Sequence, residues 1–336
     1  MTVLGREYDG GPTGHLGAYR ARDGSDGSRV LLDLDGPHAA LVVGKRGSGK
    51  SYTLGVLVEE AARVDGLAPV VLDPMGAFTT LDADPVGARV VRPRVRADAL
   101  APRAWCDLLG LDPTTATGAL VWRAAARADT LAGMCAFVEG ADAAGATRRA
   151  AANHLALADS WDVFGDAPTP FDGRATVLDC SGYDRAATNA VCRAVASRCY
   201  RDRVEGTTDR HPWLFVDEAH VPFAGVAAPA LRRLLTRGRQ PGVSLVVATQ
   251  RPSALPPVVA SQSDLVVMHR LSSRADREAM RAVRPAAVRG TLDERMPTAP
   301  GEALVVDDTS ERLHAVRVRE RETPHGGESP RLSSPR

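Results

Sequence analysis

The 336-residue sequence has a hydrophobic fraction of 44%, a charged fraction of 25% and a net charge of +1, values typical of a soluble globular chain with one large core. No apolar run approaches the ~20 residues of a membrane helix, and the N-terminal residues are too polar and acidic for a signal peptide, so we expect a cytoplasmic protein without membrane insertion. The five cysteines are odd in number and show no CxxC spacing, so the sequence predicts neither a disulfide framework nor a zinc site.

The first part of the chain predicts a small β extension followed by a buried strand and a helix. Residues 1–35 are rich in Gly and Asp, with one strand candidate at 29–34, and we interpret them as a short N-terminal β extension. Residues 38–43 form an apolar run of strand length, and residues 51–64 carry apolar side chains at helical spacing.

A glycine-rich segment joins this strand to this helix. It reads Gly44-Lys45-Arg46-Gly47-Ser48-Gly49-Lys50-Ser51 and fits the pattern G-x-x-x-x-G-K-[ST]. Its glycines allow successive backbone N–H groups to point at phosphate oxygens, at the positive end of the following helix. Lys50 adds a cation for the β/γ-phosphates, the Ser51 hydroxyl is a predicted Mg²⁺ ligand, and Tyr52 completes the nucleotide-binding segment. The segment predicts binding of ATP and Mg²⁺.

Lysine occurs only in this segment. Of 42 Lys and Arg residues, two are lysines, Lys45 and Lys50. An ammonium group is therefore retained where it must reach phosphate. No lysine remains for the guanine-recognition motif [NT]KxD, so the sequence excludes a GTPase of the usual kind.

The middle of the chain changes character. Residues 68–73 and 88–91 are strand candidates, whereas residues 98–161 are dominated by Ala, Leu and Arg and contain few β-branched residues. We expect a helical insertion of three to five helices, assigned to residues 94–169.

Strand and helix signals alternate again after the insertion. The predicted strands are 175–180, 213–216, 243–249, 264–269, 302–306 and 314–318, with helices at 184–203 and 230–237. We expect an α/β fold with a largely parallel, doubly wound sheet of about eight strands. The nucleotide-binding core is assigned to residues 36–93 and 170–319, and residues 320–336 to a disordered tail.

Two carboxylates follow the strand at 213–216. Four apolar residues precede Asp217 and Glu218, which is the Walker B form. Asp217 is predicted to hold Mg²⁺ through water, and Glu218 to polarise the water that attacks the γ-phosphate.

A polar residue also ends the strand at 243–249, which we expect beside the Walker B strand. The Gln250 amide can donate a hydrogen bond to phosphate and accept one from water, so we interpret it as a γ-phosphate sensor.

Four arginines precede this strand. They are Arg232, Arg233, Arg237 and Arg239. A ring-forming motor needs an arginine finger that reaches a neighbour's γ-phosphate, and Arg237 or Arg239 is the candidate. A basic helix face explains the four arginines equally well.

Asp73 and Asp179 each close a predicted strand. Carboxylates at the carboxyl edge of a parallel sheet lie where ligands bind, yet such residues also cap the next turn. Both interpretations stay open for both residues.

Taken together, these segments resemble the HerA/FtsK group of P-loop ATPases, and most closely its HerA-like archaeal branch. The matching segments are 38–55, 71–76, 175–182, 215–220, 238–252 and 297–306. The resemblance implies a RecA-like motor core with a helical insertion, hexameric rings, and helicase-like ATP hydrolysis coupled to translocation on double-stranded DNA. It carries over the roles of Lys50, Ser51, Asp217, Glu218 and Gln250.

The resemblance weakens at the front of the chain. HerA proteins usually carry a β-barrel there, which serves assembly and the binding of a nuclease partner. Because 43 residues precede Gly44 here, we expect a truncated or absent barrel, and a nuclease partner is in doubt. Two alternatives stay open: a conjugation- or secretion-type motor, and a nucleotide-dependent scaffold with slow hydrolysis.

Overall fold

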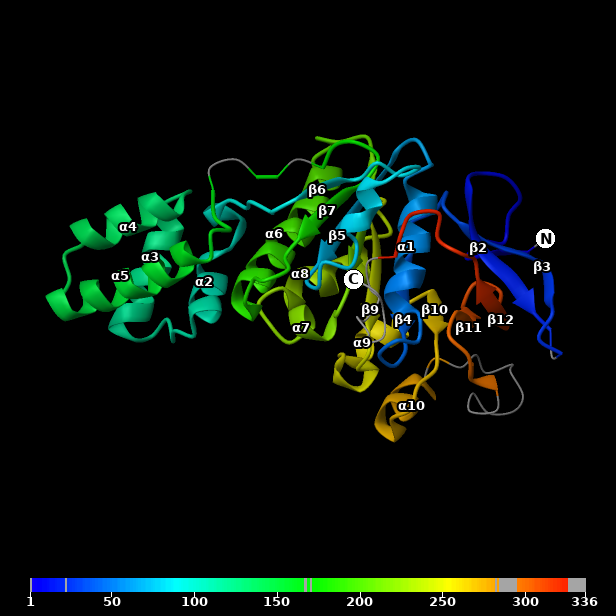
Figure 1. Cartoon of the computed structure of the whole chain (residues 1–336). Helices are drawn as coiled ribbons and strands as arrows, with labels where there is room; N and C mark the ends of the chain where they lie inside the picture. Colours follow the sequence, from blue (N-terminus) through cyan, green and yellow to red (C-terminus); the bar gives the residue numbers. More distant parts are fainter. Residues whose placement is uncertain are drawn as a thin grey trace, which may run out of the picture.

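The computed structural model describes residues 2–21, 23–165, 168–169, 171–281, 283 and 295–325, and the fold is mixed α/β (Figure 1). The described strands are β1 (Thr2–Leu4), β2 (Thr13–Arg20), β3 (Asp26–Asp33), β4 (Ala39–Val43), β5 (Leu67–Asp73), β6 (Arg89–Val91), β7 (Thr176–Asp179), β8 (His211–Val216), β9 (Ser244–Thr249), β10 (Leu265–Met268), β11 (Glu302–Asp307) and β12 (Arg312–Val318). The described α-helices are α1 (Lys50–Ala61), α2 (Pro102–Leu109), α3 (Ala116–Arg127), α4 (Leu131–Gly140), α5 (Gly145–Ser160), α6 (Arg185–Val204), α7 (His220–Phe223), α8 (Ala228–Arg237), α9 (Pro257–Ser261) and α10 (Arg274–Arg281). None of them is both long and apolar enough to cross a membrane.

The described strands form one sheet in the order β1-β3-β2-β12-β11-β10-β4-β9-β8-β5-β7-β6. The strands from β10 to β6 in this order are parallel, as predicted. Strands β5 and β9 are buried along their full length, because helices cover both faces of the parallel part. β9 lies between β4 and β8, so the carboxyl ends of these three strands are neighbours.

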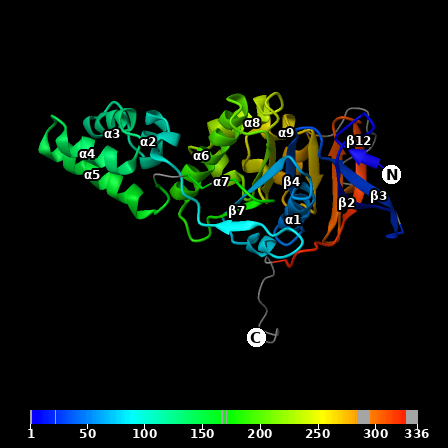
Figure 2. The same cartoon turned by 90° about the horizontal axis from the view of Figure 1, so that it is seen from above.

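The sheet has more strands than the predicted number of about eight. Twelve strands are present in the described residues, and those from β11 to β2 and β3 are antiparallel. β1 is only three residues long, and β2 contains two glycines and pairs irregularly with β3. Such segments give no clean period-two pattern, which is why the sequence indicated only one strand in this region. The N-terminal strands extend the main sheet at the end opposite the helical insertion (Figures 1 and 2).

Two hydrophobic clusters fill the two faces of the sheet. One contains Leu54 and Val58 of α1 together with apolar residues of the N-terminal strands. The other contains Val191 and Val195 of α6, apolar residues of α8, and the core of the insertion. The predicted doubly wound arrangement is therefore confirmed.

The helical insertion consists of α2, α3, α4 and α5 in the described residues, within the predicted range of three to five helices. At its base, the fully buried Trp105 donates a hydrogen bond from Nε1 to the Ala97 carbonyl (3.0 Å) and packs on Phe164. The buried apolar residues of the insertion thus belong to the same hydrophobic cluster as those of α6.

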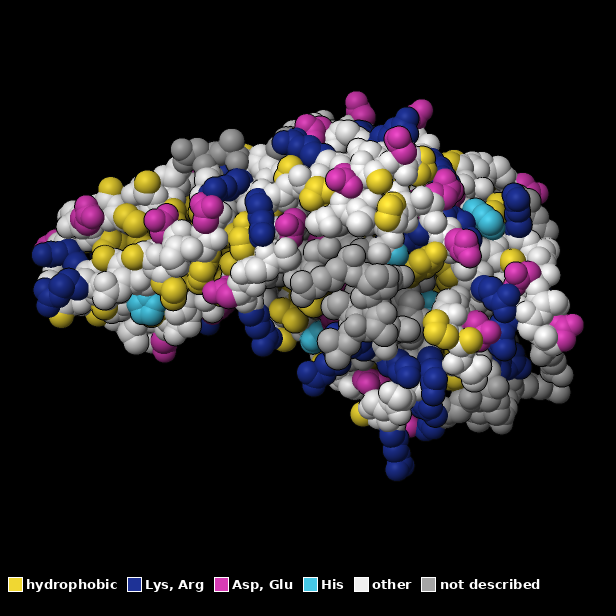
Figure 3. All heavy atoms as spheres, in the orientation of Figure 1, with side chains coloured by type: hydrophobic (Ala, Val, Ile, Leu, Met, Phe, Trp, Pro, Cys, Tyr) yellow, Lys and Arg dark blue, Asp and Glu magenta, His cyan; other side chains and the backbone are white. Residues whose placement is uncertain are grey.

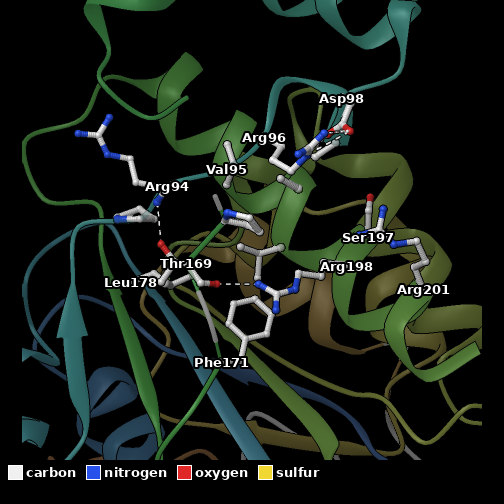
Figure 4. Close-up of a pocket in the computed structure, with 15 residues that line it drawn as sticks. Arg94, Val95, Arg96, Asp98, Thr169, Phe171, Leu178, Ser197, Arg198 and Arg201 are labelled. Carbon is white, nitrogen blue, oxygen red and sulfur yellow. Dashed lines mark hydrogen bonds and ion pairs between the residues drawn. The ribbon is translucent and has the colours of Figure 1, made fainter. Parts of the chain in front are cut away.

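A cavity of about 140 Å³ lies where the chain enters and leaves the insertion (Figure 4). Its described lining comes from residues 93–96, 98–99, 168–169 and 171, from Leu178 of β7 and from α6. The Arg198 guanidinium closes one side, because it donates to the Thr169 carbonyl (2.6 Å) and lies 4.3 Å from the centre of the Phe171 ring. Its described lining includes no residue of the glycine-rich segment 44–51.

A buried ion cluster joins the N-terminal extension to the amino edge of the parallel strands. The His38 ring contacts Asp264 through Nδ1 (2.8 Å) and Asp33 through Nε2 (3.2 Å), and Arg6 pairs with Asp33 (2.6 Å). Burial opposes the charged ring, but the hydrogen bonds and charges of the two carboxylates outweigh it and raise the pKa of His38 to about 9.

This cluster predicts that stability falls at alkaline pH. The folded His38 pKa of about 9 lies above the ordinary value of 6.5, so the stabilisation is complete below pH 6.5 and is lost as the pH rises through 9. Thermal unfolding measured from pH 6 to 10 should show a loss of roughly 3 kcal/mol for the wild type. A much flatter profile is expected for His38→Gln, and His154→Gln on α5 is the control. Parallel profiles for the wild type and His38→Gln would contradict this account.

Candidate nucleotide-binding site

The segment between β4 and α1 forms a curled loop. Gly47 (φ 73°) and Gly49 (φ 115°) have left-handed backbone conformations that favour glycine. The Ser48 side chain closes the curl by donating to the Lys45 carbonyl (2.7 Å). Gly44 also requires the absence of a side chain, because a Cβ there would lie 2.4 Å from Ser48 Oγ. The loop leads into the N-terminus of α1, as the phosphate-binding pattern predicts. The remaining loop residue, Arg46, is exposed.

The loop meets the Walker B strand through one hydrogen bond. Ser51 Oγ donates to Asp217 Oδ2 (2.9 Å), and Asp217 is 3% exposed. The Lys50 ammonium donates to the Lys45 carbonyl (3.3 Å). Burial lowers the pKa of Lys50, an effect that Asp217 and Glu218 oppose, and burial raises the pKa of Asp217. A lysine and two carboxylates are therefore held together at the carboxyl edge of the sheet.

Glu218 is held in a backbone conformation that is uncommon for a residue with a side chain. Its φ is 49°, and its N–H donates to Asp217 Oδ1 (2.8 Å). Glu218 Oε2 is buried and makes no hydrogen bond to any residue that the structure describes, although His220 Nδ1 lies 3.3 Å away. Burial raises the pKa of Glu218, and the Lys50 charge opposes this. The carboxylate thus retains an acceptor that water could use.

The sensor candidate lies where the sequence predicts. β9 pairs with β8 as expected, and Gln250 directly follows β9 between the loop strand and the Walker B strand. Its partly buried side chain makes no hydrogen bond within the described part of the chain. Instead, the neighbouring Thr249 links the two strand ends, because its Oγ1 contacts His220 Nδ1 (3.1 Å) and accepts the Arg251 N–H (3.0 Å).

The arginine-finger candidates lie away from the loop of their own chain. α8 connects two parallel strands, β8 and β9, and therefore runs back from the carboxyl edge to the amino edge of the sheet. Arg237 ends α8 and Arg239 follows it, and both are exposed. The structure does not bring either to Lys50, so either could act only on the nucleotide of another subunit.

Asp73 and Asp179 both cap turns. Asp73 accepts backbone N–H groups of Met75, Ala77 and Phe78 at 2.8–3.1 Å, while Asp179 accepts that of Ser181 at 2.9 Å. Their hydrogen bonds match the capping interpretation.

Sequence reasoning missed His269, whose side chain packs against the glycines of the loop. His269 Nδ1 contacts the Glu302 carbonyl (2.8 Å), so this nitrogen carries the proton, and Nε2 accepts from Thr53 Oγ1 (2.8 Å). Burial lowers the pKa of His269 to about 4, so the ring is neutral near pH 7. A histidine after an apolar strand gives no local signal of this role.

The donor atoms at this edge suit Mg²⁺ accompanied by phosphate. The described residues contain no group of three His, Cys, Asp or Glu side chains arranged to hold a metal. Ser51 and Asp217 offer hard oxygen atoms, and Mg²⁺ is commonly bound by one or two such groups together with water and substrate phosphates. The arrangement fits a metal that arrives with a nucleotide.

Comparisons with known proteins agree with this geometry. The sequence model described as the central domain of helicase HerA matches residues 15–139, which include the loop and most of the insertion. No curated protein matches the sequence.

Two solved structures share the fold over nearly the whole chain. VirB4 of Thermoanaerobacter pseudethanolicus is 17% identical with a TM-score of 0.72, covering 94% of this chain and 99% of its own. The plasmid coupling protein TrwB, in complex with ADP and Mg²⁺, is 15% identical with a TM-score of 0.61, covering 95% and 98%. The predicted RecA-like fold is confirmed, and so is the resemblance of this chain to the P-loop ATPases of the HerA/FtsK type.

Proposed function

We propose that the chain hydrolyses ATP at the loop between β4 and α1. The observation that carries the proposal is the Ser51–Asp217 hydrogen bond, next to a Glu218 carboxylate with a free buried acceptor. A nucleotide-dependent scaffold with slow hydrolysis would not need this second acid, so we favour an enzyme.

Each residue has a distinct part in the proposed reaction. Bound Mg²⁺ would supply charge neutralisation of the phosphates, with Ser51 and Asp217 as the residues that hold it. Lys50 exchanges its contact with the Lys45 carbonyl for phosphate oxygens. Glu218 orients a water toward the γ-phosphate and accepts its proton, which its raised pKa favours.

Gln250 would report the state of the γ-phosphate. It follows β9, whose last residue Thr249 is hydrogen-bonded to His220 in the segment after Glu218. A change in the Gln250 side chain could therefore pass to both strand ends through short contacts.

We further propose that the chain works as a cytoplasmic motor on double-stranded DNA, assembled as a hexamer. The match to the HerA central domain supports this cargo. The exposure of Arg237 and Arg239 supports a ring, because a finger must reach the next subunit. A conjugation-type motor is the second candidate, favoured by the fold likeness to the plasmid coupling protein TrwB.

Replacing Glu218 by Gln should separate binding from hydrolysis. The amide cannot accept the proton, so ATP turnover should fall about 10²–10⁴-fold while ATP affinity is retained. Glu205→Gln at the exposed end of α6 is the matched control. Unchanged turnover in the Glu218→Gln protein would exclude Glu218 as the base.

The arginine finger should act between subunits. Arg239→Ala and Arg237→Ala should show which arginine matters, with turnover reduced about 10³-fold or more in the finger variant. Mixing that variant with Glu218→Gln subunits should restore activity, because some interfaces then combine an intact finger with an intact base. Loss of activity without complementation would argue against a finger supplied in trans.

The cargo can be tested with long duplex DNA. A DNA motor should hydrolyse ATP faster when DNA is added, and its solution mass with ATP should be that of six chains. A monomer under all conditions, with no DNA stimulation, would contradict the translocase proposal and leave the conjugation-type or scaffold alternatives.

A further inference from the structure

The chain segment after β12 crosses the helix that begins in the phosphate loop. The sequence assigned residues 320–336 to a disordered tail, but residues 320–325 are bonded to α1, and residues 326–336 lie outside the described residues. Residues 319–325, the C-terminal strap, hold the fully buried Glu59 of α1. The Glu322 and Thr323 backbone N–H groups donate to the Glu59 carboxylate at 3.0–3.2 Å, and Arg319 pairs with it at 2.8 Å. A carboxylate without exposure thus has its acceptors filled by the strap.

The strap follows one face of α1 back to the loop. Positions 52, 55 and 59 share this face, because they are three and four residues apart. The Arg321 guanidinium lies against Gly55, where an added Cβ would be 2.7 Å from its central carbon. The Arg321 N–H donates to Tyr52 Oη (2.6 Å).

The strap ends with a histidine ring on Tyr52. The centroids of the His325 and Tyr52 rings are 5.2 Å apart at an interplanar angle of 70°. Two hydrogen bonds hold His325 in place. Thr80 Oγ1 donates to the carbonyl of the preceding residue, Pro324 (2.7 Å), and Arg321 Nη1 donates to His325 Nδ1 (3.3 Å). The Tyr52 ring, directly after Ser51, therefore packs against a ring that is far away in the sequence.

The position of this ring pair relative to the phosphates follows from helix geometry. The Ser51 side chain faces Asp217, on the side of the γ-phosphate. Tyr52 is rotated about 100° from Ser51 around α1, since an α-helix has 3.6 residues per turn. The base of a nucleotide is attached at the other end of the phosphate chain, away from the Walker B carboxylates.

We infer that the base of the bound nucleotide stacks on the Tyr52 ring, which the strap holds in place through the Arg321 N–H and the edge-to-face contact with His325. This inference rests on the proposed nucleotide site and adds the element that recognises the base. Aromatic rings stack on nucleobases because every base presents a π face.

The test compares ATP with inorganic tripolyphosphate, which has the phosphates but no base. Stacking is typically worth about a tenfold change in affinity per ring. Tyr52→Ala should weaken ATP binding about tenfold, and His325→Ala should weaken it by a smaller factor because the Tyr52 ring then loses its edge contact. Neither change should alter tripolyphosphate binding. Tyr52→Phe keeps the ring and should bind ATP as the wild type does. Tyr8→Ala and His154→Ala are matched controls outside the site.

The outcomes are distinguishable. Wild-type affinity for ATP in both alanine variants would overturn the inference. An equal loss of ATP and tripolyphosphate binding, with a lowered unfolding midpoint, would overturn it too, because the strap would then only support α1. Wild-type protein that binds neither ligand would contradict the proposed function itself, and this inference with it.

Discussion

The hydrogen bond between Ser51 and Asp217 is the interaction on which the site depends. It joins residues that are 166 positions apart in the sequence. The contact exists because β9 pairs with β4 on one side and with β8 on the other, which brings their carboxyl ends to one edge. β9 is buried along its full length under helices on both faces of the sheet, so the core and the site are specified by the same packing.

The arrangement of the site residues lowers the stability of the folded chain. Burial affects three charged side chains of the site, Lys50, Asp217 and Glu218. It shifts the pKa of each in the direction that favours the neutral form. Glu218 adds a left-handed backbone and an unfilled acceptor. Such costs are usually tolerated where a ligand supplies the missing partners, and a nucleotide with its metal would satisfy all three side chains.

The parts that the sequence predicted are those with local patterns. The loop, the Walker B carboxylates and the insertion are each specified by residues that are neighbours in the chain. The supports of the loop are different: Thr53 meets His269 across 216 positions, and Glu59 meets Thr323 across 264. Periodicity and motifs carry no information on such pairs. The proposed arginine finger has no partner within its own chain to be recognised by, because it would act on the nucleotide of a second subunit.

We propose above all that the loop and the Walker B strand bind one metal–nucleotide unit. The most direct measurement is a crystal structure with Mn²⁺ and a non-hydrolysable ATP analogue, in which the metal is located by its anomalous signal. We expect the metal beside Ser51 Oγ, with Asp217 in contact directly or through water and the γ-phosphate near Glu218. A metal bound elsewhere, or a nucleotide whose phosphates lie away from Lys50 and Glu218, would contradict the account.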